Sequence, residues 1–223
     1  MKNLLFFFLC ALIFTSCKNY YTIDNFDQET KSHKRIAVLP FEILITGQVP
    51  ANLTAADRDE IEIAESLLLQ TSLYNNILKR TRNKRLNVKV QHFNKTLNIL
   101  SANNIDIKSS WYMNTEELAK LLKVDAVVKA KVEQAQYFPD EVSIAIDVGT
   151  QILDIINPEI ITPGGIENNK RVRATYALID SKEGDVLWNI DYDQEADWQK
   201  SNEEIADIIN RRSTRHFPYL TKN

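Results

Sequence analysis

The first sixteen residues constrain this chain more than any other feature. Lys2 supplies a positive charge, and an unbroken apolar run extends from Leu4 to Phe14 before charge resumes at Lys18. A run of this length is too short to cross a hydrocarbon core, which needs about 20 residues. Small residues follow the run, as at the cleavage site of a secretory signal peptide. We therefore expect residues 1–16 to be a signal peptide and the folded chain to be exported.

The end of this run, Phe14-Thr15-Ser16-Cys17, resembles the lipobox of bacterial lipoproteins. In that family the cysteine receives a diacylglyceryl group on sulfur, the peptide is cut before it, and the new amine is acylated. Phe14 departs from the leucine that the family usually has. The resemblance implies that Cys17 is the lipidated first residue; the alternative is a plain signal peptide followed by a chance cysteine. Several acyl chains would hold the protein permanently, because each buried CH₂ contributes about 0.8 kcal/mol.

Cysteine usage decides how the exported chain must hold its fold. The only other cysteine, Cys10, lies in the segment that would be removed. The mature chain then has no disulfide, no thiol nucleophile and no cysteine metal site. It must rely on an apolar core, which about 200 residues with 44% hydrophobic content can supply. The net charge of −3 is small, and we expect no nucleic-acid partner.

The chain divides into a short polar segment and one domain. Residues 18–33 show little apolar periodicity, so we expect 17–33 to be the lipidated cysteine and a flexible tether, and 34–220 to be a single domain. Its patterns predict these elements in order: a buried strand over 35–41, a loop over 42–56, a helix over 57–80, a half-exposed strand over 86–92, two short helices capped by Asn94 and Asn114, and a strand over 125–137.

The long helix has an apolar stripe at steps of three and four. Thr54 or Asp57 would cap its start. Basic residues gather at its other end, where the helix dipole favours cations. The stripe that we expect to be buried consists of Ile61, Ala64, Leu67, Leu68, Tyr74, Ile77 and Leu78.

The second half of the chain predicts a hairpin and a final helix. Residues 140–156 fit a helix, but their alternation also fits a strand. Strands over 171–180 and 185–198 flank a turn at Gly184, and Ser201 opens a helix to about residue 215. The whole order predicts an α/β fold with a mixed sheet of about five strands flanked by helices.

Four segments together resemble a group of periplasmic lipoproteins. These are the opening strand at 35–41, the helix and strand over 117–128, the hairpin over 176–188 and the closing Phe217-Pro218-Tyr219. The group includes activators of penicillin-binding proteins, soluble domains of the curli channel and neisserial vaccine-candidate lipoproteins, and the amino-terminal domain of TolB is similar. Lys123 and Ala130 depart from the pattern, because the family often has glycine at both positions.

No catalytic constellation can be assembled from the residues. His33, His92 and His216 are far apart without metal-ligand spacing, and we expect them on the surface. We therefore expect no enzyme activity, no metal and no cofactor; an enzyme acting on envelope glycan or peptide is an alternative. A row of carboxylates on the last strand could bind a cation or form a solvated outer face, and we favour the solvated face. The row consists of Asp191, Asp193, Glu195 and Asp197.

The expected function is that of a membrane-anchored binding or accessory module. Trp111 and Tyr112 are the expected contact residues for a cell-envelope protein, although such aromatic residues also pack beneath loops. By family analogy we expect an outer-membrane anchor with the domain facing the periplasm. A homo-oligomer is possible, and the alternative function in this class is a subunit of an oligomeric export channel.

Overall fold

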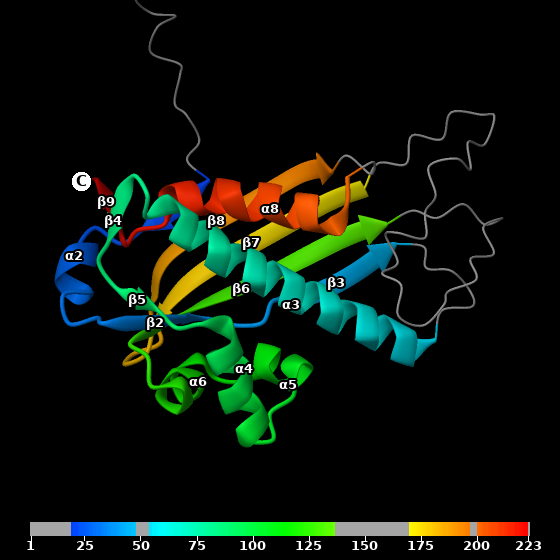
Figure 1. Cartoon of the computed structure of the whole chain (residues 1–223), viewed down its shortest axis with the longest axis horizontal. Helices are drawn as coiled ribbons and strands as arrows, with labels where there is room; N and C mark the ends of the chain where they lie inside the picture. The colour runs from blue at the N-terminus through cyan, green and yellow to red at the C-terminus, as the bar shows by residue number, and fades with distance from the viewer. Residues whose placement is uncertain (1–18, 48–53, 137–169, 197–199, 223) are drawn as a thin grey trace, which may run out of the picture.

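A mixed sheet lies at the centre of the fold in the computed structural model, which describes residues 19–47, 54–136, 170–196 and 200–222 (Figure 1). The seven strands of this sheet are ordered β1-β8-β7-β6-β2-β5, and β3 also pairs with β6. They are β1 (Tyr20–Thr22), β2 (Arg35–Val38), β3 (Glu42–Gly47), β5 (Lys89–Val90), β6 (Ala126–Gln136), β7 (Lys170–Asp180) and β8 (Val186–Ala196). The fold class is therefore the predicted one, with more strands than expected.

Parallel and antiparallel pairing meet at β6. On one side β6 pairs in parallel with β2 and then with β3, and on the other it pairs antiparallel with β7. Pro40 separates β2 from β3, since it has no N–H to donate. The side chain of Gln70 donates to the Val38 carbonyl at 2.8 Å, immediately before this break. Thus two short strands in line occupy one side of the long β6.

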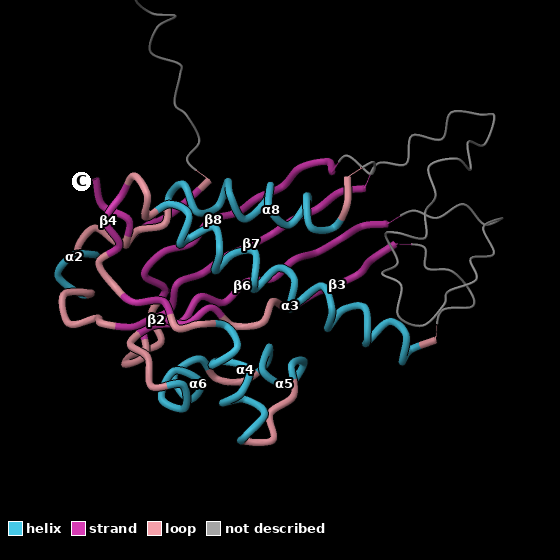
Figure 2. The backbone as a smooth tube through the Cα atoms, in the orientation of Figure 1, coloured by secondary structure: helices cyan, strands magenta, loops and turns pink. Residues whose placement is uncertain are grey.

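Helices cover the sheet as separate layers, seen most clearly in the tube view (Figure 2). The long α3 (Ala55–Arg80) and α8 (Asn202–Ser213) pack side by side on one face. A group of shorter helices lies near β2, at the edge of the sheet opposite β1. This group is α4 (Phe93–Ala102), α5 (Ile107–Tyr112) and α6 (Thr115–Leu122).

Strand alternation divides the core into two clusters. Val128, Val132 and Tyr176 point to the larger cluster, beneath α3 and α8. Ala37 and Val127 point to the opposite face, where they meet apolar residues of α4 and α6. The buried strands therefore contribute side chains to both faces, as expected for strands covered on both sides.

The N-terminal segment corrects our expectation of a flexible tether. Residues 19–33 form β1 and the short helix α2 (Phe26–Glu29), and Phe26 is buried in the larger cluster. β1 pairs antiparallel with β8, with Tyr21 opposite Asn189. The segment was hard to recognise because its three-residue strand gains its hydrogen bonds from a partner about 170 positions away, and so carries no local periodicity.

The buried face of α3 also differs from the predicted stripe. Ile77 is buried as expected, but Ala64 and Leu78 are exposed. Polar side chains take inner positions as well, because side chains on other elements donate hydrogen bonds to them. Glu62 accepts from Lys108, and Glu65 accepts from Gln134. The buried residues of α3 are Glu62, Glu65, Ser66, Leu69, Gln70, Leu73, Asn76 and Ile77.

Two predicted boundaries were wrong. The expected loop over 42–56 contains β3, in which Ile43 and Ile45 are buried while Leu44 and Thr46 are exposed. The expected strand over 86–92 is divided between β5 and a small second sheet of β4 (Lys84–Leu86) and β9 (Leu220–Lys222). β9 lies after the Phe217-Pro218-Tyr219 segment, where we expected the fold to end.

Element ends set by local chemistry were predicted well. Thr54 and Ser201 each form a capping box, and Asn114 caps α6. The exception is α4, where His92 is the cap rather than Asn94. The hairpin of β7 and β8 is confirmed, with Gly184 at φ +74° in its turn. The 140–156 segment lies outside the described residues.

Candidate functional site

The proposed anchor, Cys17, lies two positions before the first described residue. Asn19 is already fixed to the sheet: its side-chain amide donates to the Asp191 carbonyl at 3.0 Å, and the Asp191 N–H donates to the Asn19 carbonyl at 3.0 Å. Two residues span at most about 7 Å. An acyl group on Cys17 would therefore be attached almost directly to the edge of the sheet.

The two aromatic residues expected to contact a partner have different positions. Trp111 lies in α5 and is only 3% exposed, packed in the larger core cluster. Tyr112 is 75% exposed. A partner can therefore reach Tyr112 on this surface, whereas Trp111 supports the position of α5 from within.

The three histidines differ in environment, and His33 is not on the surface as we expected. Its Nδ1 lies 2.6 Å from the Tyr219 hydroxyl, and its Nε2 lies 3.0 Å from Asp180 Oδ1. The side chain of His33 is 1% exposed. His92 and His216 are exposed, as predicted. Burial keeps His33 away from any substrate in solution, so this trio links the N-terminal segment, the hairpin and the C-terminal segment.

Burial and hydrogen bonds shift the titration of groups near this link. Burial raises the pKa of the Tyr219 hydroxyl above its usual range, and the charge of Asp180 raises it further. Asp125 accepts hydrogen bonds from the backbone N–H groups of Lys34 and Arg35 at 2.7 and 2.8 Å. Burial opposes ionisation of Asp125, but these two donors outweigh it and lower its pKa overall.

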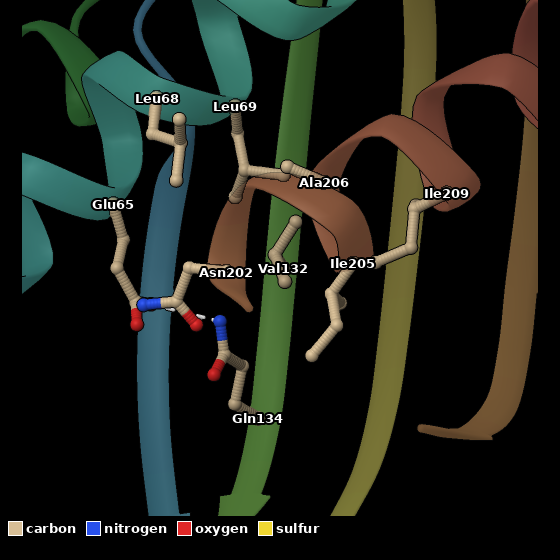
Figure 3. Close-up of a pocket in the computed structure, with 9 residues that line it drawn as sticks. All are labelled: Glu65, Leu68, Leu69, Val132, Gln134, Asn202, Ile205, Ala206 and Ile209. Carbon is tan, nitrogen blue, oxygen red and sulfur yellow. Dashed lines mark hydrogen bonds between the residues drawn. The ribbon is translucent and has the colours of Figure 1, made fainter. Parts of the chain in front are cut away.

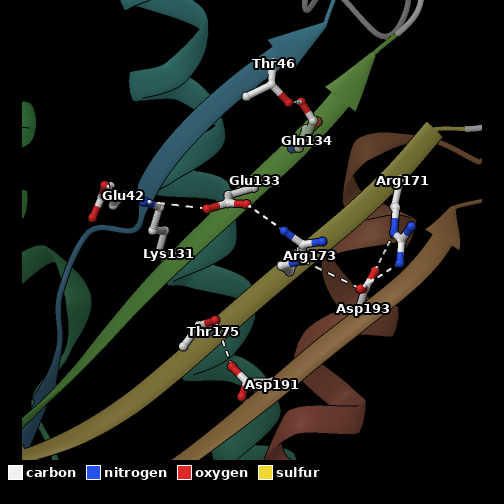
Figure 4. Close-up of polar contacts among 10 residues, drawn as sticks. All are labelled: Glu42, Thr46, Lys131, Glu133, Gln134, Arg171, Arg173, Thr175, Asp191 and Asp193. Carbon is white, nitrogen blue, oxygen red and sulfur yellow. Dashed lines mark hydrogen bonds and ion pairs between the residues drawn. The ribbon is translucent and has the colours of Figure 1, made fainter.

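A network of charged side chains covers part of the sheet face away from α3 and α8 (Figure 4). It arises because outward positions of β3, β6, β7 and β8 alternate with the core positions of the same strands. We call it the charged face: Glu42, Lys131, Glu133, Arg171, Arg173, Thr175, Asp191 and Asp193.

The charged face is an ordered chain of opposite charges. Lys131 Nζ lies 3.3 Å from Glu42 Oε1, and Arg173 lies 3.2 Å from Glu133 on the neighbouring strand. Asp193 accepts two hydrogen bonds from Arg171, at 2.8 and 2.9 Å. Exposed ion pairs add only about 0–1 kcal/mol each to stability. Their arrangement places positive and negative groups side by side across neighbouring strands.

Pairing also sets the charge state of the face. The pKa of Asp193 is lowered by its hydrogen bond with Arg171, and the charge of Arg173 lowers it further. The charge of Glu42 raises the pKa of Lys131. Both shifts favour the charged forms, so the face keeps its alternating charges at neutral pH.

The predicted carboxylate row belongs to this face. Asp193 is paired with arginines, and Asp191 accepts a hydrogen bond from Thr175 at 2.8 Å. The side chains of Glu195 and Asp197 lie outside the described residues. Among the residues that the structure describes, no group of three or more His, Cys, Asp or Glu side chains is arranged to hold a metal ion. The described half of the row therefore has the character of a solvated, paired outer face.

A shallow cleft between α3 and α8 offers less chemistry (Figure 3). Most of its lining is apolar, as with Leu69 of α3 and Ile205 of α8. Its carboxylate, Glu65, is 6% exposed and accepts a hydrogen bond from Gln134 at 2.8 Å. The polar groups are thus engaged with each other, and the cleft is a packing seam between two helices and β6.

No helix in the described part of the chain is long and apolar enough to span a bilayer.

Sequence reasoning missed the charged face as a unit. The outward alternation of β6 and β8 was visible, but the cross-strand register that pairs Glu133 with Arg173 and Arg173 with Asp193 was not. Each partner is more than fifteen residues away along the chain, and only the sheet brings them together.

No protein-family model matches the chain, and no curated protein sequence matches it. Similar solved structures include the lipoprotein GNA1162 from Neisseria meningitidis, with 13% identity over 82% of this chain and 97% of that chain and a TM-score of 0.46. PelC from Paraburkholderia phytofirmans, solved as a dodecamer, has 10% identity over 86% of this chain and 90% of that chain, with a TM-score of 0.40. The LpoB C-terminal domain from Salmonella enterica has 7% identity over 77% of this chain and 93% of that chain, with a TM-score of 0.35.

Proposed function

We propose that this protein is a lipid-anchored, non-catalytic binding module of the bacterial cell envelope. Cys17 would be acylated and would hold the domain at the outer membrane, facing the periplasm. The observation that carries the proposal is the direct connection between the lipobox and the sheet: Cys17 is two residues from Asn19, which pairs with β8 through two hydrogen bonds. Such an anchor would fix the orientation of the domain as well as its location.

The charged face is the surface that we assign to a partner protein. It lies on the central sheet, and the cross-strand register fixes the order in which its charges alternate. Positive and negative groups are nearly balanced across four strands. The expected partner surface therefore carries both signs of charge, and complementary charge would select it and speed its association.

Anchoring would make modest contacts sufficient. A domain confined to the same membrane as its partner meets it at a high effective concentration, and weak binding then gives high occupancy. Tyr112, exposed on α5, is a second contact candidate. It lies in the group of shorter helices at the β2 edge of the sheet.

The test is co-purification from detergent-solubilised membranes of the native host, read by mass spectrometry. We compare the wild-type protein with an Arg171→Glu/Arg173→Glu variant and with a Lys95→Glu/Lys120→Glu control. The control makes the same charge change at exposed lysines of α4 and α6, away from the charged face. We expect an envelope protein that is retained by wild type and control and reduced at least tenfold in the arginine variant.

Two outcomes would contradict the assignment. One is equal recovery of the partner with all three proteins, which would show that the charged face does not contact it. The other is a ring of this chain alone in native mass spectra, which would favour the channel-subunit alternative. Thermal unfolding of each variant shows whether its fold is retained.

A further inference from the structure

Six Lys and Arg residues lie where α3 and α8 end. Arg80 ends α3, and its guanidinium donates to the backbone carbonyl of Arg211 on α8 at 2.7 Å. A three-residue turn joins α3 to β4, which adds two further cations beside β9. We call this group the basic patch: Arg80, Arg82, Lys84, Arg85, Arg211 and Arg215.

The basic patch is not neutralised by neighbouring acids. Within the described residues, none of its members forms an ion pair; the nearest pair, Lys79 with Asp207 at 3.2 Å, lies one position before Arg80. Burial lowers the pKa of Arg80, and the charges of Arg215 and Arg211 lower it further. The chain as a whole carries a net charge of −3, so this concentration of positive charge is local.

The helix dipole alone does not explain the patch. Cations at a helix C-terminus are favoured by about 0.3–1 kcal/mol each, and only within the last turn. Arg82, Lys84 and Arg85 lie beyond the end of α3, so the dipole of that helix does not account for them. A local concentration of cations without acidic partners among the described residues suits an anionic surface outside the protein.

The patch lies beside the strand that leads to the anchor. The ring of Tyr20, the first residue of β1, stacks on His216 with centroids 4.2 Å apart and an interplanar angle of 13°. His216 directly follows Arg215, and the charges of Lys84, Arg215 and Arg80 contribute to lowering its pKa after the larger effect of burial. Figure 1 shows β1 beginning near the end of α8. Cys17 is three residues from Tyr20, a span of at most about 10 Å.

We propose that the basic patch binds the anionic headgroups of the membrane to which Cys17 is attached, and so fixes how the domain sits on the bilayer. This inference rests on the proposed acylation of Cys17. Acyl chains would supply permanent attachment, and the patch would supply orientation, since acyl chains and cations act as two separate membrane signals. Each Lys or Arg near an anionic surface improves partitioning roughly fivefold.

The test uses the mature protein isolated from its host, carrying a single added thiol. Because an acylated Cys17 has no free thiol, Asn83→Cys in the turn before β4 gives a unique labelling position for an environment-sensitive fluorophore. We measure quenching by acrylamide with vesicles of phosphatidylcholine alone, and with vesicles containing about one third phosphatidylglycerol. A label at Ala102→Cys, on α4 at the opposite edge of the sheet, is the positional control.

We expect anionic vesicles to reduce quenching of the Asn83 label at least threefold, and not that of the Ala102 label. High salt should reverse the protection, because it screens the interaction. A variant with four exposed patch arginines changed to glutamine should lose the protection: Arg82, Arg85, Arg211 and Arg215. A matched variant with four exposed lysines changed to glutamine should keep it: Lys89, Lys95, Lys120 and Lys123.

Equal quenching with both vesicle types, or equal protection in the two four-residue variants, would overturn the patch assignment. Equal or tighter binding of a DNA duplex than of anionic vesicles would also overturn it. The intact mass of the protein distinguishes failure of the patch proposal from failure of the proposed acylation of Cys17. If the mass shows no acyl chains, the proposed function fails, yet flotation of that unmodified chain with anionic but not neutral vesicles would still support the patch; no flotation would refute both.

Discussion

Tyr20 and His216, almost two hundred positions apart, stack ring on ring and join the first strand to the last helical turn. Their centroids are 4.2 Å apart and the rings are nearly parallel. This contact and the pairing of β1 with β8 replace a tether with a fixed connection. The position of any anchor at Cys17 is therefore coupled to the end of α8.

Removing the Tyr20 ring should loosen that connection. We expect Tyr20→Ala to lower the free energy of unfolding by about 1 kcal/mol, the size of an aromatic pair contribution. Hydrogen exchange of the Ile23 amide, which donates to the Leu187 carbonyl at 3.1 Å, should become about fivefold faster, because the end of β1 then opens more often. Tyr20→Phe, which keeps the ring, is the control. Unchanged exchange in Tyr20→Ala would show that the stack does not hold β1.

The same histidine predicts a pH dependence of stability. Burial, then the charges of Lys84, Arg215 and Arg80, lower the pKa of His216 below its ordinary 6.5. Below pH 6.5 the unfolded chain then binds more protons than the folded one, so stability should decline as pH falls from about 7 through 6.5 towards the folded pKa.

Urea unfolding of wild type and His216→Gln between pH 7.5 and about 5 checks this dependence. The slope of stability against pH should be smaller in His216→Gln than in wild type. Equal slopes for wild type and His216→Gln would contradict the expectation.

Lys123 offers a stabilising substitution. It ends α6 in the left-handed conformation at φ 56°, where a side chain is strained and glycine is not. We expect Lys123→Gly to raise the free energy of unfolding by roughly 0.5–1 kcal/mol. Lys120→Gly, within α6, should lower it by a similar amount, because glycine is unfavourable inside a helix. A loss of stability in Lys123→Gly would contradict this account of the helix end.

Tyr176 and Asn210 form a buried link between β7 and α8. The Tyr176 hydroxyl donates to Asn210 Oδ1 at 2.9 Å, and the Asn210 amide donates to the Leu69 carbonyl of α3 at 3.1 Å. Tyr176→Phe should cost about 1–3 kcal/mol, since it leaves a buried acceptor without its donor. The double variant Tyr176→Phe/Asn210→Leu, compared with the two single variants, measures the coupling energy between the two side chains. If the changes in the free energy of unfolding from chemical denaturation are strictly additive, the hydrogen bond contributes nothing specific.

Local chemistry made part of this fold predictable. Gly184 marked the hairpin turn, and the spacing of Ser201 and Glu204 marked the start of α8. The buried face of α3 was not predictable in the same way. Glu62 and Glu65 are inner residues only because Lys108 and Gln134 reach them from α5 and β6, and no periodicity within α3 reports those partners.

The candidate site shows the same division. Cys17 stands out from its local sequence, and the outward carboxylates of β8 follow from strand alternation. The charged face and the basic patch need the register of four strands and the convergence of two helix ends. The tether expectation failed for this reason too, because a three-residue strand such as β1 is stable only when β8 is beside it.

The most direct test of the central claim is the intact mass of the mature protein from its native membranes. The account predicts a chain that begins at Cys17 and carries a diacylglyceryl group and an amide-linked acyl chain, recovered in the membrane fraction. Cys17→Ser should abolish that mass. A wild-type chain recovered unmodified in the aqueous fraction would contradict the account.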